Sequence, residues 1–306
     1  MKSVGVIGVG SMGAPMVKNL LQAGFRVCVY DKRSEALDPL VSMGAQSALS
    51  PSELAKRSEV AITMLPSPTA VEEAVLGVKG AIEGVSKGKI LVEMSTIDPS
   101  TAQRVGRSVS ATGAEFLDAT VNGIPPVAEQ GQLVIMAGGK VEVINRCMDI
   151  FSALGKSVIR VGEIGDAKKC KLAGNMLIAI QMVAASELAA WIKTAGLDLQ
   201  LFCQVFHNSF RDEETYNRFR SINEGRFRGG PNWAHKDLGL GLEVASQLGI
   251  PMPLAAVARS IHQAAKVMQG EDRGLLGTVR FYESITGARL SPQDAPGSAK
   301  GSRTKG

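Results

Sequence analysis

The first half of this 306-residue chain alternates short apolar runs with amphipathic segments, and this alternation constrains the fold most strongly. The apolar runs are rich in Val, Ile and Leu and have the length of buried strands. Strands and helices in turn are typical of a parallel sheet with helices on both faces. The predicted strands span residues 4–7, 26–30, 60–64, 90–94, 115–119, 133–137 and 157–161, and the predicted helices span 14–23, 52–57, 69–76, 100–111 and 141–154.

The second half has a different pattern, because runs typical of strands stop after Gly165. A long helix is predicted over residues 168–194, with further helices over 197–206, 234–248 and 253–269. The stretch after Leu290 is rich in Ser, Gly and Lys and has no aromatic residue. We therefore expect an α/β domain over residues 1–163, an all-α domain over 164–290 that begins with a long interdomain helix, and a disordered tail over 291–306.

The first predicted strand runs into Gly8-Val-Gly-Ser-Met-Gly13, and a predicted helix follows directly. In this context Gly8 permits a tight turn, Gly10 lets the backbone approach a pyrophosphate, and Gly13 lets the helix pack closely on the strand. The helix N-terminus presents N–H groups and a partial positive charge to phosphates. The alternative is a glycine-rich loop without a ligand. The flanking strand and helix favour dinucleotide binding by a doubly wound sheet of the Rossmann type, followed by the all-α domain.

An acidic residue, Asp31, follows the second predicted strand directly. A carboxylate at this place accepts hydrogen bonds from the adenosine ribose diol and repels a 2′-phosphate, which favours NAD. Lys32 and Arg33 come next, and their charges would instead attract that phosphate. NAD is therefore the expected cofactor and NADP is the alternative. A solvated turn is the third interpretation of these residues.

The overall charge excludes some partners. The 34 Lys and Arg residues exceed the 29 Asp and Glu residues by 5, and so weak a positive charge does not indicate nucleic-acid binding. The four cysteines are far apart and the three histidines form no HxxxH pair, so we expect reduced thiols and no metal site. No run of about 18 uninterrupted apolar residues occurs. We expect a soluble, cytoplasmic protein without nucleic-acid or membrane partners.

Several motifs follow one another in order along the chain. They are Gly8-Val-Gly-Ser-Met-Gly-Ala-Pro-Met16 with Asn19-Leu-Leu, Met64-Leu-Pro66, Glu93-Met-Ser-Thr-Ile97, Asp118 to Gly139, Gly165 to Asn175, and Lys236-Asp-Leu238. By these motifs, over about residues 1 to 285, the chain resembles the β-hydroxyacid dehydrogenases. This is the 3-hydroxyisobutyrate dehydrogenase family, which includes tartronate semialdehyde and sulfolactaldehyde reductases.

The resemblance implies roles for particular residues. Lys171 would be the catalytic acid/base, Asn175 would orient the substrate, and Asn122 and Gly123 would lie in the substrate-binding loop. The resemblance also implies a small anionic substrate and a homodimer or homotetramer. The cofactor-binding residues would be Gly8, Gly10, Ser11, Met12, Gly13, Asp31, Lys32, Arg33, Met64, Leu65 and Pro66, with Thr96 on the nicotinamide side and Lys236 from the second domain.

The residues themselves support a pairing of Lys171 with Asn175. The two are four positions apart, so they share one face of a helix. Oxidation of an alcohol needs a group that takes the hydroxyl proton while hydride leaves. A lysine that is desolvated in a cleft near a second cation, such as Lys168, has a pKa lowered toward neutrality and can take that proton. The alternative is a plain basic helix face formed by Lys168, Lys169 and Lys171.

The substrate loop departs from the family pattern. Members commonly read Asp-Ala-Pro-Val-Ser-Gly-Gly, whereas this chain has Asp118-Ala-Thr-Val-Asn-Gly-Ile124. Asn122 can still donate from its amide to a carboxylate, but Ile124 narrows the pocket, so the identity of the substrate is not carried over. Arg211, in the polar stretch 208–214, would form a fork for a second anionic group of the substrate, or else lie on the surface or pair with a local acid.

These observations predict an NAD(P)-dependent oxidoreductase that interconverts a small β-hydroxyacid and its semialdehyde by hydride transfer, with Lys171 as acid/base and without a metal. One alternative is an imine reductase on the same scaffold, which typically has another residue at the position of Lys171. The other is a non-catalytic dinucleotide-binding protein, although such relatives lose the catalytic lysine. The physiological direction is left open, since the same geometry serves oxidation and reduction.

Overall fold

The computed structural model describes residues 2–206, 213–226, 231–269 and 277–290. The chain forms two compact units, Met1–Leu172 and Ala173–Gly306. The division falls inside one long helix, α9 (Asp166–Thr194), whose first two turns or so belong to the first unit. The predicted boundary after residue 163 lies just before the start of this helix.

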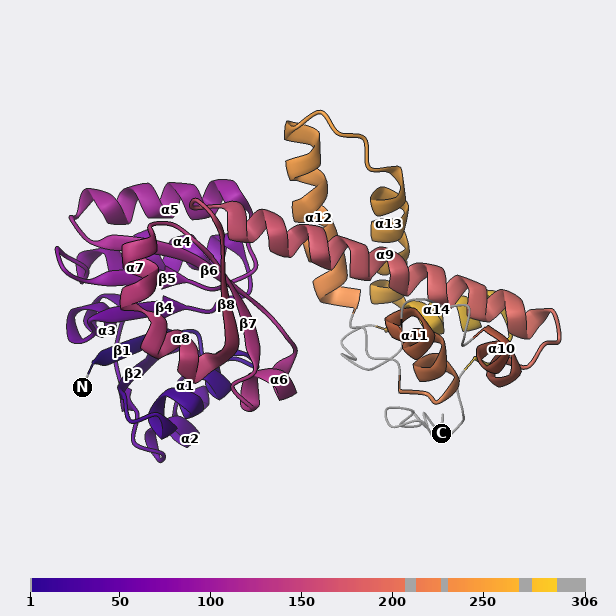
Figure 1. Cartoon of the computed structure of the whole chain (residues 1–306), viewed down its shortest axis with the longest axis horizontal. Coiled ribbons are helices and arrows are strands. Elements are labelled where there is room, and N and C mark those ends of the chain that lie inside the picture. The colour runs from indigo at the N-terminus through magenta and orange to yellow at the C-terminus, as the bar shows by residue number, and fades with distance from the viewer. Residues whose placement is uncertain (1, 207–212, 227–230, 270–276, 291–306) are drawn as a thin grey trace, which may run out of the picture. The chain divides into compact units, whose positions relative to one another are not determined.

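The first unit contains one eight-stranded sheet in the order β3-β2-β1-β4-β5-β6-β7-β8 (Figure 1). Its strands are β1 (Ser3–Ile7), β2 (Arg26–Tyr30), β3 (Gln46–Ser47), β4 (Val60–Thr63), β5 (Ile90–Glu93), β6 (Glu115–Asn122), β7 (Leu133–Gly138) and β8 (Gly155–Gly162). All seven predicted strands are present. The edge strand β3 was not predicted, because two residues are too few to show a periodicity.

The sheet is parallel except at one place, where β6 and β7 pair in the antiparallel sense. The segment between these two strands is short and carries only the helix α6 (Pro125–Glu129). A parallel crossover needs a dozen or more residues, usually including a longer helix. The alternation of strands and helices therefore predicts parallel neighbours correctly elsewhere in the sheet, but not here.

Helices cover both faces of the sheet, as the alternation predicts (Figure 1). Successive residues of each strand point to opposite faces, so that Val92 packs into one apolar core and Leu91 into the other. The helices of the first face are α1 (Gly13–Gln22), α2 (Asp38–Val41), α6, α7 (Val141–Arg146) and α8 (Met148–Leu154). Those of the second face are α3 (Pro51–Arg57), α4 (Pro68–Leu76) and α5 (Pro99–Ala111), together with the 3-10 turn η2 (Ala81–Glu83). The 3-10 turn η1 (Ser34–Ala36) packs against the core of the first face.

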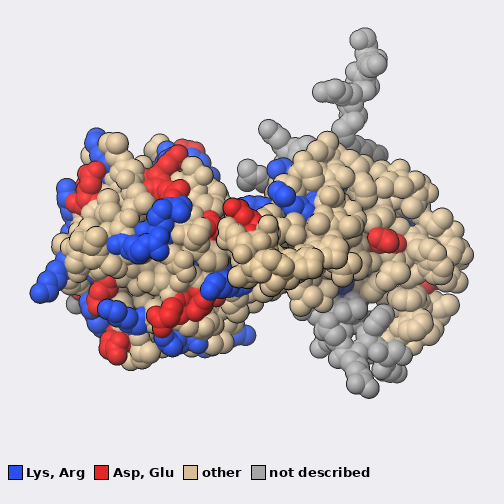
Figure 2. Space-filling model, turned by 90° about the horizontal axis from the view of Figure 1, so that it is seen from above, with Lys and Arg blue, Asp and Glu red and all other residues tan. Residues whose placement is uncertain are grey.

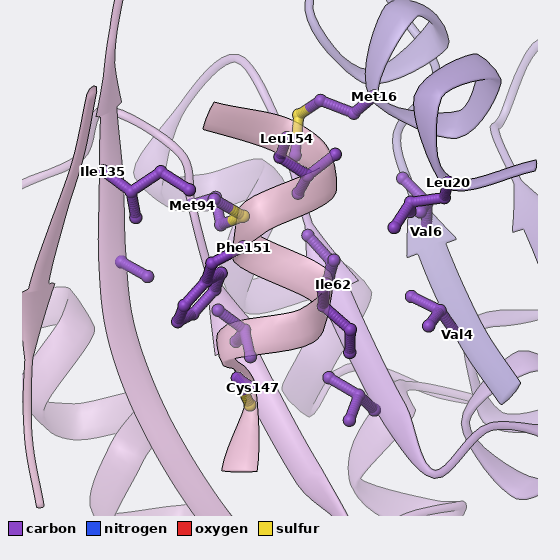
Figure 3. Close-up of a cluster of buried hydrophobic side chains, with 14 of the residues drawn as sticks. Val4, Val6, Met16, Leu20, Ile62, Met94, Ile135, Cys147, Phe151 and Leu154 are labelled. Carbon is purple, nitrogen blue, oxygen red and sulfur yellow. The ribbon is translucent and has the colours of Figure 1, made fainter. Parts of the chain in front are cut away.

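The sequence predicts a single helix over residues 141–154, and this prediction is wrong. The structure has two helices, α7 and α8, which meet at the fully buried Cys147. With φ −100° and ψ 0°, the backbone at Cys147 departs from regular helix geometry. Phe151 and Leu154 of α8 lie in the same apolar core as Met94 and Ile135 (Figure 3).

A side-chain cap and a proline begin each helix of the second face. Ser50, Ser67 and Asp98 each accept a hydrogen bond from the backbone N–H three residues later. A proline follows each of these caps at the start of the helix. Both features favour a helix N-terminus. The N-terminus of α1 has no such side-chain cap.

The second unit, as far as it is described, consists of helices. After α9 these are α10 (Leu199–Phe206), α11 (Glu213–Asn223), α12 (Pro231–Gln247), α13 (Pro253–Gln269) and α14 (Gly277–Thr286). Two apolar clusters fill this unit, one around Met182 and Leu199 and the other around Met176 and Leu238. The helices α11 and α14 were not predicted, whereas the four predicted helices are present. Arg211 and the predicted tail 291–306 lie outside the described residues.

Helix α9 is the one helix of the described residues that is long and apolar enough, by length and composition, to cross a membrane. Of its most apolar 18-residue window, 56% is buried inside the structure. A helix in the core of a water-soluble protein can have the same length, apolar composition and burial as α9. The apolar character of α9 therefore does not by itself indicate a membrane segment.

Candidate functional site

The turn between β1 and α1 contains three glycines. At Gly8 and Gly13 a side chain would collide with the backbone, whereas the space around Gly10 is open. Gly8 has φ +93°, and a Cβ there would overlap the carbonyl oxygen of Met64. A Cβ at Gly13 would overlap the carbonyl oxygen of Gly8, so only glycine allows α1 to pack this closely on β1. Around Gly10 the space is open, with the Arg33 guanidinium 4.0 Å from an ideal Cβ. This geometry fits the close approach of a diphosphate to the backbone.

The N-terminus of α1 lies at the same glycine turn. No side chain in the first turn of the helix neutralises its partial positive charge. It has neither a side-chain cap nor an acidic residue in the first turn. Ser11 is exposed and Met12 is half-buried at this end of the helix. Because the positive end of the helix dipole favours an anion, a phosphate of the cofactor fits here.

Asp31, at the end of β2, is bonded to the glycine turn. The N–H of Val9 donates to its Oδ2 at 2.9 Å, and the N–H and guanidinium of Arg33 donate to its Oδ1 at 3.0 and 3.2 Å. Burial by itself would raise the pKa of Asp31, but these hydrogen bonds outweigh it and hold the pKa below its usual value. The carboxylate is therefore ionised and close to the turn, as recognition of a ribose diol requires. The neighbouring Lys32 forms an ion pair with Glu73 of α4 at 2.6 Å.

The ends of β4 and β5 continue the same edge of the sheet. The N–H of Leu65, just after β4, donates to Ser95 Oγ at 2.8 Å. Met64 and Leu65 are half-buried and Pro66 is exposed, while the half-buried Thr96 directly follows Ser95. The predicted cofactor residues of the first unit thus follow the carboxyl ends of four neighbouring strands, β2, β1, β4 and β5. Ligands of open α/β sheets bind at this edge.

The structure brings the predicted catalytic lysine into contact with the predicted substrate loop. Lys171, half-buried in the second turn of α9, donates from Nζ to Oδ1 of Asn122 at 3.1 Å. Asn122 is exposed at the end of β6, and Gly123 follows with φ +146°. A Cβ at Gly123 would press on the Leu133 side chain, so glycine is required at this turn. Two residues 49 positions apart in the sequence therefore form one polar pair.

The second unit contains another group of predicted residues. Nδ2 of the buried Asn175 donates to Oδ2 of Asp237 at 2.6 Å. The other oxygen of Asp237 forms an ion pair with Lys236 at 3.1 Å. Asp237, which is almost fully buried, therefore joins Asn175 of α9 to Lys236 of α12, and sequence analysis did not single it out.

A buried ionic network lies beneath the Asn122–Lys171 pair. Lys168 is 0% exposed, and its Nζ lies 2.5 Å from Glu93 Oε2 and 2.8 Å from Asp118 Oδ1. It also donates to Thr120 Oγ1 at 2.7 Å and to the carbonyl oxygens of Glu93 and Ser95 at 3.1 and 2.9 Å. Burial by itself would lower the pKa of Lys168, but the charges of Asp118 and Glu93 outweigh it and raise the pKa. The lysine is therefore protonated at neutral pH.

This placement differs from the sequence-based expectation for Lys168. That expectation made Lys168 an extra cation beside Lys171, yet two carboxylates compensate its charge. A signal for the network was present in the sequence: Glu93 and Asp118 stand in the apolar runs 90–94 and 115–119. A carboxylate in a strand covered on both faces is buried and requires a cationic partner.

No group of three or more His, Cys, Asp or Glu side chains that could hold a metal ion occurs among the residues that the structure describes.

Comparison with known proteins identifies the family. Residues 3–162 match the model for the NAD binding domain of 6-phosphogluconate dehydrogenase. Residues 165–282 match the model for the NAD-binding domain of NADP-dependent 3-hydroxyisobutyrate dehydrogenase. The mitochondrial 3-hydroxyisobutyrate dehydrogenase of Mus musculus is 33% identical over 270 residues, which cover 85% of this chain and 81% of the mouse protein. The chain belongs to the 3-hydroxyisobutyrate dehydrogenase family.

Two further comparisons agree with this membership. The 2-(hydroxymethyl)glutarate dehydrogenase of Eubacterium barkeri is 29% identical over 294 residues, which cover 94% of this chain and 97% of that protein. The crystal structure of a 3-hydroxyisobutyrate dehydrogenase from Salmonella typhimurium is 25% identical, with a TM-score of 0.79 over 92% of this chain and 100% of that one. As a member of the 3-hydroxyisobutyrate dehydrogenase family, the protein is an NAD(P)-dependent oxidoreductase of CH–OH groups.

Proposed function

We propose that the protein interconverts a small β-hydroxyacid, of the 3-hydroxyisobutyrate type, and its semialdehyde, with Lys171 as the general acid/base. The observation that carries this proposal is the hydrogen bond of Lys171 to Asn122, at the edge of the sheet where the dinucleotide-binding turn lies. A nicotinamide cofactor bound at this edge supplies or accepts the hydride. The proton must then be handled by a group of the protein.

In this proposal Lys171 transfers the proton and Asn122 binds the substrate. In oxidation the neutral amine of Lys171 takes the hydroxyl proton, and in reduction its ammonium returns a proton to the carbonyl oxygen. Since the amide oxygen of Asn122 accepts from Lys171, its NH₂ group is left to donate to the substrate carboxylate. The backbone N–H of Gly123 offers a second donor. A small anionic substrate matches this set of groups.

The other predicted residues complete the proposal. Nδ2 of Asn175 donates to Asp237, which leaves its amide oxygen to accept from the substrate hydroxyl. Lys236 contributes to cofactor binding from the second unit, together with the residues of the glycine turn and of the strand ends. Arg211 would hold a second anionic group where the substrate has one. We further propose a cytoplasmic location and assembly as a homodimer or homotetramer.

The test is hydride transfer by purified Lys171→Ala, with 3-hydroxyisobutyrate and NAD⁺. We expect kcat to fall by about 10²- to 10⁴-fold, because a positioned acid/base contributes that much. The dissociation constant of NADH, measured by fluorescence, should stay within about threefold of wild type. Lys169→Ala is the matched control, since Lys169 is exposed on the same turn and pairs with Asp166. Near wild-type kcat in Lys171→Ala would refute the assigned role.

A substrate panel identifies the semialdehyde. Tartronate, succinate and methylmalonate semialdehydes and sulfolactaldehyde are assayed with NADH and NADPH in parallel, and cyclic imines form a separate arm. Reduction of a carboxylate-bearing semialdehyde is the expected result. Turnover of imines alone would favour imine reduction, and NADH binding without any turnover would favour a non-catalytic protein.

A further inference from the structure

The buried network around Lys168 connects the segments that carry the proposed active-site residues. Each of its members stands close in sequence to one of them: Ser95 precedes Thr96, Thr120 lies two residues before Asn122, and Lys168 lies three residues before Lys171. Two further bonds widen the connection. Ser95 Oγ accepts from the N–H of Leu65, and Asp118 Oδ2 accepts from the N–H of Gly165, just before α9.

The strand register explains why a cation is needed here. Glu93 of β5 and Asp118 of β6 are direct register partners, and both are 0% exposed. Like charges on neighbouring strands repel one another, and burial removes the water that would screen them. The ammonium of Lys168 lies within 2.8 Å of both carboxylates, so it holds the two strands to the start of α9.

Five oxygen atoms lie within 3.1 Å of this one nitrogen, and they come from β5, the residues after it, and β6. Any displacement of the first turn of α9 would separate buried charges from their partners, which is costly. The network therefore resists small shifts of Lys171 relative to Asn122. A misplacement of about 1 Å at a reacting group can reduce a rate about 10²-fold.

We propose that Lys168, with Glu93 and Asp118, is a positioning device that sets the place of Lys171 relative to Asn122 and Thr96. Lys168 is a positioning residue and does not touch the substrate. This inference rests on the proposed function of Lys171. The competing interpretation is a network that only stabilises the fold.

Two variants test the proposal. The double variant Lys168→Met/Glu93→Gln removes the ammonium together with one carboxylate, because removal of the lysine alone would leave two buried charges unpaired. Thr120→Val is the milder variant, since it removes one acceptor from Nζ and keeps the shape of the side chain. Phe151→Leu, in α8 and in the apolar core of the first unit, is the control for lowered stability without a change at the site.

With 3-hydroxyisobutyrate and NAD⁺ as probes, we expect kcat to fall about 10²-fold in the double variant and about tenfold in Thr120→Val. KM for NAD⁺ should change by less than about threefold in both variants. Phe151→Leu should have a lower melting temperature than wild type and an unchanged kcat. A folded double variant with kcat within about threefold of wild type overturns the proposal. If the double variant does not fold, a kcat of Thr120→Val within about threefold of wild type overturns the proposal.

Hydrogen exchange separates this proposal from the proposed function, because it needs no turnover. Compared with wild type, the backbone amides of residues 119–123 and 166–172 should exchange faster in both variants, whereas those of α8 should not change. If wild type transfers no hydride with any substrate, the proposed function fails, and the exchange result still decides the positioning proposal. Unchanged exchange over both segments in both variants overturns it.

Discussion

At the end of β2, the Asp31 carboxylate is bonded on one side to the glycine turn and on the other to Arg33. An adenosine ribose can share such a carboxylate, but a 2′-phosphate would meet its negative charge. Arg33 would have to leave Asp31 before it could hold that phosphate, and Lys32 would have to leave Glu73. The arrangement of these four charges therefore favours NAD.

Substitution of Asp31 by serine tests this preference. We expect Asp31→Ser to raise the ratio of kcat/KM for NADP⁺ to kcat/KM for NAD⁺ at least tenfold, or about 1.4 kcal/mol. The change removes the repulsive charge and releases Arg33. Asp38→Ser, at an exposed position of α2, is the control. An unchanged ratio in Asp31→Ser would show that the carboxylate does not select the cofactor.

We expect the four cysteines to differ in reactivity, because they differ in burial. Cys170 is exposed on α9, whereas Cys28, Cys147 and Cys203 are buried. Burial raises the pKa of Cys28 and Cys203 and raises that of Cys147 to about 12. The thiolate is the reactive form, so at pH 8 the thiols with raised pKa values are almost entirely protonated and unreactive.

A thiol-specific reagent at pH 8 should therefore modify Cys170 first in the native protein. The other three should react only after unfolding, and peptide mass spectrometry identifies the modified residue in each phase. Cys170→Ser should abolish the fast phase. Equal rates for Cys147 and Cys170 in the native protein would contradict the burial of Cys147.

At the scale of elements, one buried carboxylate ties two helices of the second unit together. Asp237 on α12 accepts from Asn175 on α9 and pairs with Lys236, while only 3% of it is exposed. Without this carboxylate, the buried amide of Asn175 would lose a strong hydrogen bond. The free-energy cost of removing the amide from water would then no longer be compensated.

We expect Asp237→Ala to lower the free energy of unfolding by about 1–3 kcal/mol, as measured by urea denaturation. Glu243→Ala, at an exposed position of the same helix, should change it by less than about 0.5 kcal/mol. Loss of equal size in both variants would mean that the Asn175–Asp237 contact contributes nothing specific.

Sequence patterns predicted most elements, and their failures have local causes. The apolar runs mark seven strands because burial on both faces requires continuous apolar side chains. The antiparallel pairing of β6 with β7 and the break at Cys147 were missed, because connection geometry and local backbone direction leave no trace in an apolar pattern.

For the whole molecule, the two units differ in surface character. Among the described residues, 8 large apolar side chains are exposed in the first unit and 14 in the second, although the second unit is shorter. On the face shown in Figure 2, charged side chains cover much of the first unit, whereas most of the second unit, on the right, is uncharged. Leu188 and Trp191 contribute an exposed apolar turn of α9, at 51% and 64% exposure. If the protein forms the homo-oligomer proposed above, this apolar surface is where we expect a second copy of the chain to bind.

A charge on this surface should weaken the proposed homo-oligomer. We expect Trp191→Glu to shift the protein toward the monomer, because a carboxylate would be buried without a partner in the interface. Size-exclusion chromatography with light scattering measures the mass. Gln204→Glu, which adds the same charge at an exposed polar position of α10, should leave the assembly intact. A monomeric wild-type protein would contradict the proposed oligomer.

By itself, the sequence determined the two-part architecture, the glycine turn and the order of the family motifs. These are local properties, because periodicity and turn chemistry are set by residues near one another in the chain. Only the tertiary structure decided that Lys168 pairs with Glu93 and Asp118, that Asn122 meets Lys171, and that Asp237 joins two helices. These contacts depend on strand register and on the packing of α9. Both are fixed by the burial of the whole core, which no short stretch of residues encodes.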